Sequence, residues 1–110
     1  MNDIHSKFRD HVKSLQNHAI PESDRLFCGG LGLTEEAGEV AGLIKKHRFQ
    51  GHDLDKDAMR SELGDVLWYV QFICMNLDLT IEECMQMNIS KLTERYKDGF
   101  KAEASINRKQ

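Results

Sequence analysis

The chain has 110 residues, 40% of them hydrophobic and 30% charged, with one proline and a formal net charge of −3. This length allows one domain, and the apolar content with so little proline excludes a disordered or fibrous protein. No window approaches the roughly 18 uninterrupted apolar residues of a membrane span. Mild acidity argues against non-specific binding of nucleic acid, which requires a basic face. We therefore expect one globular domain over residues 1–110, with no membrane or nucleic-acid partner.

The N-terminal sequence MNDIHSKFRD lacks a basic stretch followed by an apolar segment, so nothing marks it for secretion and a cytoplasmic location is expected. The three cysteines are an odd set without a C-x-x-C pair, and two of them lie in apolar helical patterns. We expect Cys28, Cys74 and Cys84 to be reduced thiols of the core.

Apolar residues recur at helical spacing in the first half of the chain. The first predicted helix ends before Pro21 and carries Ile4, Phe8, Val12 and Leu15 on one side. The segment PESDRLFCGG is expected to be a loop. A second helix is predicted from about Leu31 to Lys46, and the polar segment FQGHDLDKD after it is predicted to be a loop.

The second half of the chain predicts two more helices. One runs from roughly Ala58 to Leu77 and is apolar almost all round, so we expect it to be buried on several sides, against another subunit as well. A capping box at Thr80 to Glu83 begins the last helix, which stops at Gly99 and leaves residues 101–110 as a loose polar tail. The pattern predicts an all-α four-helix bundle completed by oligomerisation.

Carboxylates are grouped on the second and third predicted helices. Residues three or four apart share a helix face, so each helix presents one acidic arc: Glu35, Glu36 and Glu39 on the second, Glu62 and Asp65 on the third. Antiparallel helices can bring these arcs together, where the acids would repel unless a cation binds between them. Oxygen ligands select a hard ion, Mg²⁺ or Mn²⁺. The alternative is that the acids are only the solvated faces of amphipathic helices.

Three glycines lie inside these two helices although each costs up to about 1 kcal/mol of helix propensity relative to alanine. We expect Gly38, Gly42 and Gly64 to permit close helix approach or ligand access. The run from Gly29 to Gly32 is too weak a pattern to predict a phosphate-binding loop.

The last predicted helix has a basic edge. Its residues Asn88, Lys91 and Arg95 lie within about 60° of one another, and we expect the Asn88 amide to be partly buried. Such donors suit the far side of metal-bound phosphates. The alternative is a capped helix with a solvated basic edge.

The segments LGLTEEAGEVAGLIKK, ELGDVLWYV and NISKLTERYKDGF, in this order, resemble the MazG-like nucleoside triphosphate pyrophosphohydrolases of the all-α NTP pyrophosphatase group. The resemblance implies an enzyme that requires Mg²⁺, for which Mn²⁺ can substitute, and that cleaves a (d)NTP into (d)NMP and pyrophosphate. It also implies a homodimer or homotetramer with a role in nucleotide house-cleaning or control of the dNTP pool.

The resemblance further implies roles for particular residues. The metal ligands would be Glu36, Glu39, Glu62 and Asp65. Glu39 or Glu35 would take the proton of the attacking water, although many relatives have glycine at the position of Glu35. The triphosphate would contact Asn88, Lys91, Arg95 and Tyr96, with Lys45 or Lys46 as further candidates. The base would rest against aromatic or apolar side chains, for which Phe8, His11, Trp68 and Tyr69 are available. Relatives often have proline after the arginine and tyrosine, where this chain has Lys97.

Two alternatives to this function stay open. One is a non-catalytic helical module in which the apolar third helix mediates oligomerisation. The other is a related pyrophosphohydrolase with a different substrate, such as phosphoribosyl-ATP or a nucleoside diphosphate.

Overall fold

The computed structural model describes residues 3–108, and within this range all regular structure is helical. The helices are α1 (Ile4–Ser14), the 3₁₀ helix η1 (Glu22–Asp24), α2 (Arg25–Phe49), α3 (Lys56–Asn76), α4 (Ile81–Arg95) and α5 (Ala102–Ile106). The all-α class is therefore confirmed. Over the described residues, no helix is long and apolar enough to cross a membrane. The chain divides after Asp78 into two compact units, which we describe separately.

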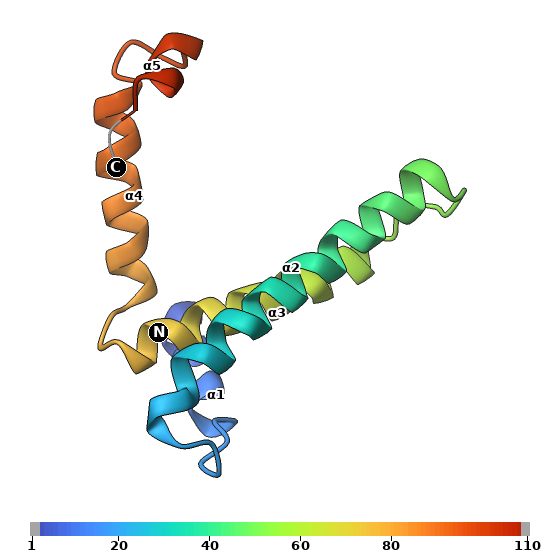
Figure 1. The fold of residues 1–110 in the computed structure, drawn as a ribbon, viewed down its shortest axis with the longest axis vertical. Helices are drawn as coiled ribbons and strands as arrows, with labels where there is room; N and C mark the ends of the chain where they lie inside the picture. Colours follow the sequence, from blue (N-terminus) through green and yellow to red (C-terminus); the bar gives the residue numbers. More distant parts are fainter. Residues whose placement is uncertain (1–2, 109–110) are drawn as a thin grey trace. The chain divides into compact units, whose positions relative to one another are not determined.

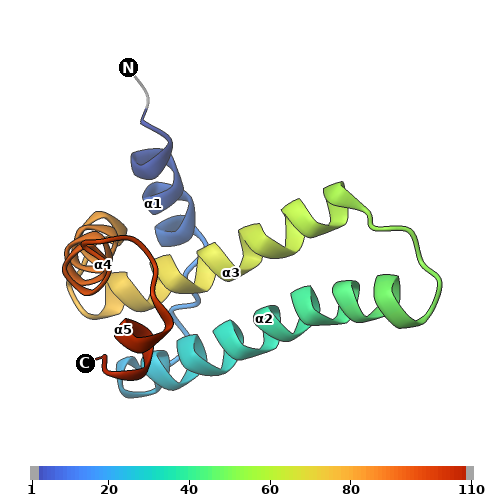
Figure 2. The same cartoon turned by 90° about the horizontal axis from the view of Figure 1, so that it is seen from above.

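In the first unit, α2 and α3 form a long antiparallel pair joined by a short loop (Figures 1 and 2). The loop contains Gly51 at a positive φ of 74°, a conformation that glycine adopts without steric cost. Asp55 then caps α3, because its side chain accepts hydrogen bonds from the backbone N–H groups of Asp57 and Ala58 at 2.9 and 3.1 Å. The turn and the cap together start α3 antiparallel to α2.

The helix α1 packs on α3 and begins at a side-chain cap. Asp3 accepts a hydrogen bond from the N–H of His5 at 3.1 Å. Val12 is completely buried, whereas Ile4 and Leu15 at the two ends of the apolar side are exposed. The predicted apolar side of the first helix is thus buried only around its middle.

The helix α2 begins six residues before the predicted start, so the prediction of a loop over residues 25–30 was wrong. Its first turns contain glycines, which lower helix propensity, but two of them are buried against α3. A Cβ atom on Gly29 would lie 2.7 Å from Ile73 Cγ1 and 3.2 Å from Phe72 Cδ2, and one on Gly32 would overlap the Tyr69 ring. Packing against α3 therefore stabilises helix where local sequence disfavours it.

The glycines that were expected to permit close approach do not do so within this chain. A Cβ atom on Gly38, Gly42 or Gly64 would meet no other atom within 4 Å. The close approach of α2 and α3 instead uses the pair near the start of α2. For close approach the prediction named the wrong glycines, because helical spacing alone does not show which face of α2 meets α3. Ligand access, the other role expected of these glycines, stays a prediction.

The helix α3 is less buried in the isolated chain than its composition predicts. Gln71, Phe72 and Cys74 are buried, but Leu63 and Leu67 are 47% and 52% exposed. The cysteines also differ from the prediction of three core thiols: besides the buried Cys74, Cys28 is half-buried and Cys84 is exposed.

The second unit contains α4 and α5. The predicted capping box is confirmed: the Thr80 hydroxyl accepts from the Glu83 N–H at 3.0 Å, and the Glu83 carboxylate accepts from the Thr80 N–H at 3.2 Å. The helix ends at Arg95, four residues before Gly99. The segment expected to be a loose tail contains the short helix α5.

The packing of Gly32 against Tyr69 gives a testable prediction. Gly32→Ala should lower the free energy of unfolding by about 1–3 kcal/mol, because the added methyl group must displace a ring that also contacts Trp68 and Phe72. Gly38→Ala is the matched control, and it should raise stability by up to about 1 kcal/mol because its Cβ enters open space on a helix. Urea denaturation followed by circular dichroism measures both. Equal effects of the two substitutions would contradict the assigned contact.

Candidate functional site

Three carboxylates from two helices converge in the first unit. Glu36 comes from α2, and Glu62 and Asp65 come from α3. One oxygen of each lies within 4.8 Å of the others, and Asp65 is the exposed member. These are three of the four residues predicted as metal ligands. The structure therefore shows the expected antiparallel arrangement of α2 and α3, in which carboxylates of both helices lie close together.

The register of α2 against α3 explains this convergence. Gly29 lies against Phe72 and Gly32 lies against Tyr69. A residue three positions later in α2 therefore contacts a residue three positions earlier in α3, as expected for antiparallel helices. Glu36 lies one turn beyond Gly32, and Asp65 lies one turn before Tyr69. The same register places these two carboxylates opposite each other.

The electrostatics of the cluster are unfavourable without a cation. The pKa of Glu36 is raised above its ordinary value of 4.5, first by partial burial and then by the negative charges of Asp65 and Glu62. Glu35 and Glu39 add smaller contributions in the same direction. Both are exposed, and neither belongs to the group of converging oxygens. The structure therefore places them beside the cluster, near enough to act on Glu36 through their charge.

The donor set fits a hard divalent cation. An octahedral Mg²⁺ at about 2.1 Å from each ligand oxygen holds those oxygens about 3 to 4 Å apart. The three oxygens of the cluster lie within 4.8 Å of one another, which is close to this spacing. All three donors are carboxylate oxygens, which favour Mg²⁺ or Mn²⁺ over softer metals.

Tyr69 borders the carboxylate cluster and belongs to an aromatic group on α3. Its ring centroid lies 5.0 Å from that of Trp68 in an edge-to-face arrangement, and Trp68 stacks on Phe72 at 5.4 Å. Burial raises the pKa of Tyr69, with added contributions from Cys28 and Glu36. Tyr69 was predicted as a substrate-binding residue. In the structure, one edge of its ring is occupied by the backbone of Gly32.

Lys45 is exposed near the end of α2, away from the carboxylates. It follows Glu36 by nine residues, and at about 100° per residue the two side chains leave the helix on opposite sides. The structure therefore does not bring Lys45 to the cluster on its own chain.

The remaining predicted substrate residues lie in the second unit. Lys91 and Arg95 line a pocket of about 670 Å³, and Tyr96 is the C-cap of α4. Asn88 is exposed, so the expectation of a partly buried amide was wrong. The apolar residues that share its side of α4 are themselves incompletely covered in the described chain.

Sequence reasoning missed two features of these sites. The spacing of Gly29 and Gly32, three residues apart, was the available sign that one face of α2 is free of side chains. Lys101 and Arg108, which line the pocket with Lys91 and Arg95, lie in the segment expected to be a loose tail. Their basic character was visible, but their return to α4 depends on the turn at Gly99.

An all-α chain with carboxylates converging from two antiparallel helices defines a class of helical proteins suited to binding a divalent cation. Comparison with known families identifies a more specific group: the MazG nucleotide pyrophosphohydrolase domain matches residues 30–100. The chain belongs to this family. A similar protein is the Gene 37 protein of Mycobacterium phage L5, 34% identical over 82 residues that cover 71% of this chain and 72% of the phage protein. No solved structure gave a significant match.

The charge of Glu36 gives a second prediction. Because its pKa is raised in the folded protein, ionisation of Glu36 costs stability as the pH rises above 4.5, and this cost is absent below that value. Without divalent cations, Glu36→Gln should therefore raise the melting temperature at pH 7 and have little effect near pH 4. Addition of Mg²⁺ should stabilise the wild-type protein more than the variant.

The control for this experiment is Asp10→Asn, which removes an exposed carboxylate from α1. It should change neither the pH dependence nor the response to Mg²⁺. A Glu36→Gln variant that is less stable than wild type at both pH values would contradict the repulsion assigned to the cluster.

Proposed function

We propose that this protein is a Mg²⁺-dependent nucleoside triphosphate pyrophosphohydrolase that converts a (d)NTP to (d)NMP and pyrophosphate. The observation that supports this most strongly is the convergence of Glu36, Glu62 and Asp65 in a chain of the MazG nucleotide pyrophosphohydrolase family. A nucleotide carries a polyphosphate chain whose negative charge requires compensation, and the carboxylates can hold the cation that provides it.

In this proposal Glu36, Glu62 and Asp65 bind Mg²⁺, with Glu39 completing the ligand set. When bound, Mg²⁺ compensates phosphate charge and lowers the pKa of water. The chain itself supplies position: α2 and α3 hold the carboxylates in a fixed register, so little rearrangement is needed when the ion and substrate enter. No nucleophilic side chain is required for cleavage between the α- and β-phosphates, because water is the nucleophile.

A carboxylate that is not saturated by the metal must accept the proton from the attacking water. Glu39 and Glu35 are the candidates, because both influence Glu36 electrostatically and both are exposed to solvent. Glu39 is the better one, because it is opposite Glu62 in the register of the pair.

The proposed enzyme is an oligomer of this chain. Phe27 and Leu31 lie one turn apart on α2 and are 72% and 73% exposed, and Leu63 and Leu67 form a similar half-exposed strip on α3. Soluble monomers rarely leave such apolar strips on adjacent helices uncovered. A second copy of the chain, packed on these strips as a homodimer or within a homotetramer, supplies the burial that α3 was expected to have.

The activity is tested by pyrophosphate release over a panel of ribo-, deoxy- and modified nucleoside triphosphates, with phosphoribosyl-ATP and nucleoside diphosphates included. We expect Mg²⁺-dependent release from at least one triphosphate. Glu39→Gln and Asp65→Asn should each reduce kcat by about 100-fold or more, since general-base and metal contributions have this size.

Circular dichroism should show that both variants stay folded, and Asp10→Asn should retain wild-type turnover. Wild-type rates in Asp65→Asn would contradict the proposed site. Failure of Mg²⁺ with a non-hydrolysable triphosphate to raise the melting temperature of the wild type would favour a non-catalytic helical module.

The oligomer is tested by sedimentation velocity. Leu31→Asp and Leu67→Asp each place a charge in a surface that we expect a second copy to cover, so either should shift the protein toward monomer. Ile106→Asp, at an exposed residue of α5, is the control and should leave the assembly unchanged. A wild-type protein that sediments as a monomer at tens of micromolar would contradict the proposed assembly.

A further inference from the structure

The chain reverses direction after α4, so the residues that follow Gly99 return to the end of that helix. Gly99 has a φ of 85°, and its N–H donates a hydrogen bond to the Tyr96 carbonyl at 2.8 Å. The Phe100 ring packs on Tyr96 with a centroid distance of 5.2 Å. The Ser105 side chain hydrogen-bonds to the Tyr96 hydroxyl. Tyr96 therefore anchors the C-terminal segment at three successive points.

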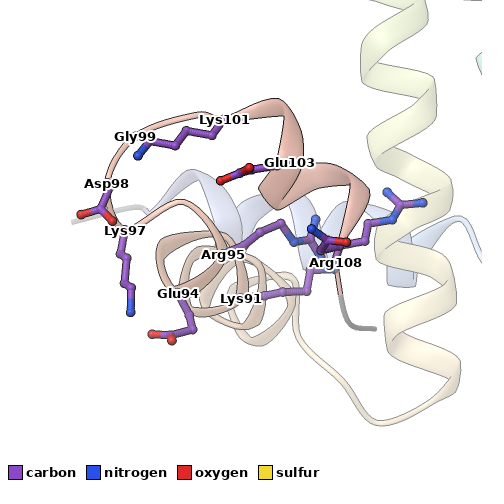
Figure 3. A pocket seen from close by; sticks show the side chains of 10 residues that line it. Lys91, Glu94, Arg95, Lys97, Asp98, Gly99, Lys101, Glu103 and Arg108 are labelled. Carbon is purple, nitrogen blue, oxygen red and sulfur yellow. The ribbon is translucent and has the colours of Figure 1, made fainter.

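This reversal forms an open pocket of about 670 Å³ between α4 and the C-terminal segment (Figure 3). Both sides contribute cations: Lys91 and Arg95 come from α4, and Lys101 and Arg108 come from the returning segment. In the view of Figure 3, the Lys91 and Arg95 side chains extend toward the returning segment at Arg108, whose guanidinium ends farther out on that side. The Lys101 side chain extends the other way, toward Gly99, and the Glu103 carboxylate lies between Lys101 and Arg95 in this view. The volume is within the range of small-molecule sites.

The charge of the pocket is positive and incompletely compensated. Its lining includes five cationic residues, with Lys97 as the fifth, and three carboxylates. Within residues 3–108, no carboxylate lies in ion-pair range of Lys91, Lys101 or Arg108. The pKa of Tyr96 is lowered, first by the Ser105 hydrogen bond and then by Arg95 and Arg108. Cations that line one pocket repel one another unless an anion binds among them.

We propose that Lys101 and Arg108 are phosphate-binding residues that act with Lys91 and Arg95 to hold the polyphosphate chain of the nucleotide. The inference rests on the proposed function and extends it, because residues 101–108 follow the matched domain, which ends at residue 100. Two basic residues from each side of the pocket can contact different phosphate groups of one chain. Arginine is well suited to this role because its guanidinium forms paired hydrogen bonds with phosphate oxygens.

The test uses inorganic triphosphate as the probe, without nucleotide or divalent cation, in calorimetric titrations at low ionic strength. Lys101→Ala and Arg108→Ala should each weaken binding about tenfold, the size expected for loss of a charged hydrogen bond. Arg108→Lys keeps the charge and should recover part of the loss. Lys7→Ala is the control, because it removes an exposed lysine of α1 that does not line the pocket.

Steady-state kinetics provide an independent measurement on the full chain. Arg108→Ala should raise KM for the triphosphate substrate about tenfold with kcat within a factor of two, since it removes binding that the ground state and transition state share. A variant that binds inorganic triphosphate like Lys7→Ala, or a wild-type protein that does not bind it, would overturn the inference.

The inference and the proposed function can fail separately. Asp65→Asn should lose turnover and still bind inorganic triphosphate with wild-type affinity. Hydrolysis by the wild type together with unchanged triphosphate binding in Lys101→Ala and Arg108→Ala would overturn the role of the C-terminal segment and leave the enzyme assignment intact. No hydrolysis of any nucleotide, with binding lost in those variants, would overturn the enzyme assignment and support the anion site.

Discussion

The site in the first unit depends on the contact between the Tyr69 ring and the backbone of Gly32. Because Gly32 has no side chain, the Tyr69 ring can lie directly against α2. One turn earlier, Gly29 likewise leaves space for the side chains of Phe72 and Ile73. These contacts determine both the distance between the helices and their register. A shift of α3 by one turn would move Asp65 away from Glu36. The geometry of the carboxylates is therefore a consequence of apolar packing that lies outside the cluster.

This packing holds like charges together at a cost in stability. Partial burial and the neighbouring carboxylates both favour the neutral form of Glu36. The hydrophobic contacts of α3 offset that cost, since Phe72 and Cys74 are almost fully buried. In the proposed enzyme, a site assembled in this way would bind a cation with little reorganisation, because the repulsion is already present in the metal-free protein and the ion would relieve it. Stability and metal affinity are thus coupled through the same few side chains.

Sequence patterns predicted the features that depend on residues close together in the chain. The capping box at Thr80 and the acidic arcs are of this kind, because hydrogen-bonding groups or helical spacing define them locally. The start of α2 was predicted wrongly because it depends on packing against residues about 40 positions later, which compensates for poor helix propensity. The position of Arg108 beside α4 was missed for a similar reason. The position of Arg108 depends on a positive φ at Gly99 and on contacts of Tyr96, and the hydrophobic periodicity of the sequence predicts neither.

The distribution of charge along α2 and α3 keeps the carboxylates available. Residues 35–65 carry eight acids and five bases, a difference equal to the whole net charge of −3. All five bases lie near the connecting loop, where Arg60 pairs with Asp57. From residue 26 to residue 44 of α2, and from residue 61 to the end of α3, there is no lysine or arginine. A cation at one of those positions could pair with Glu36 and remove the repulsion. Because neither helix supplies one beside the cluster, its charge remains to be compensated by an ion from solution.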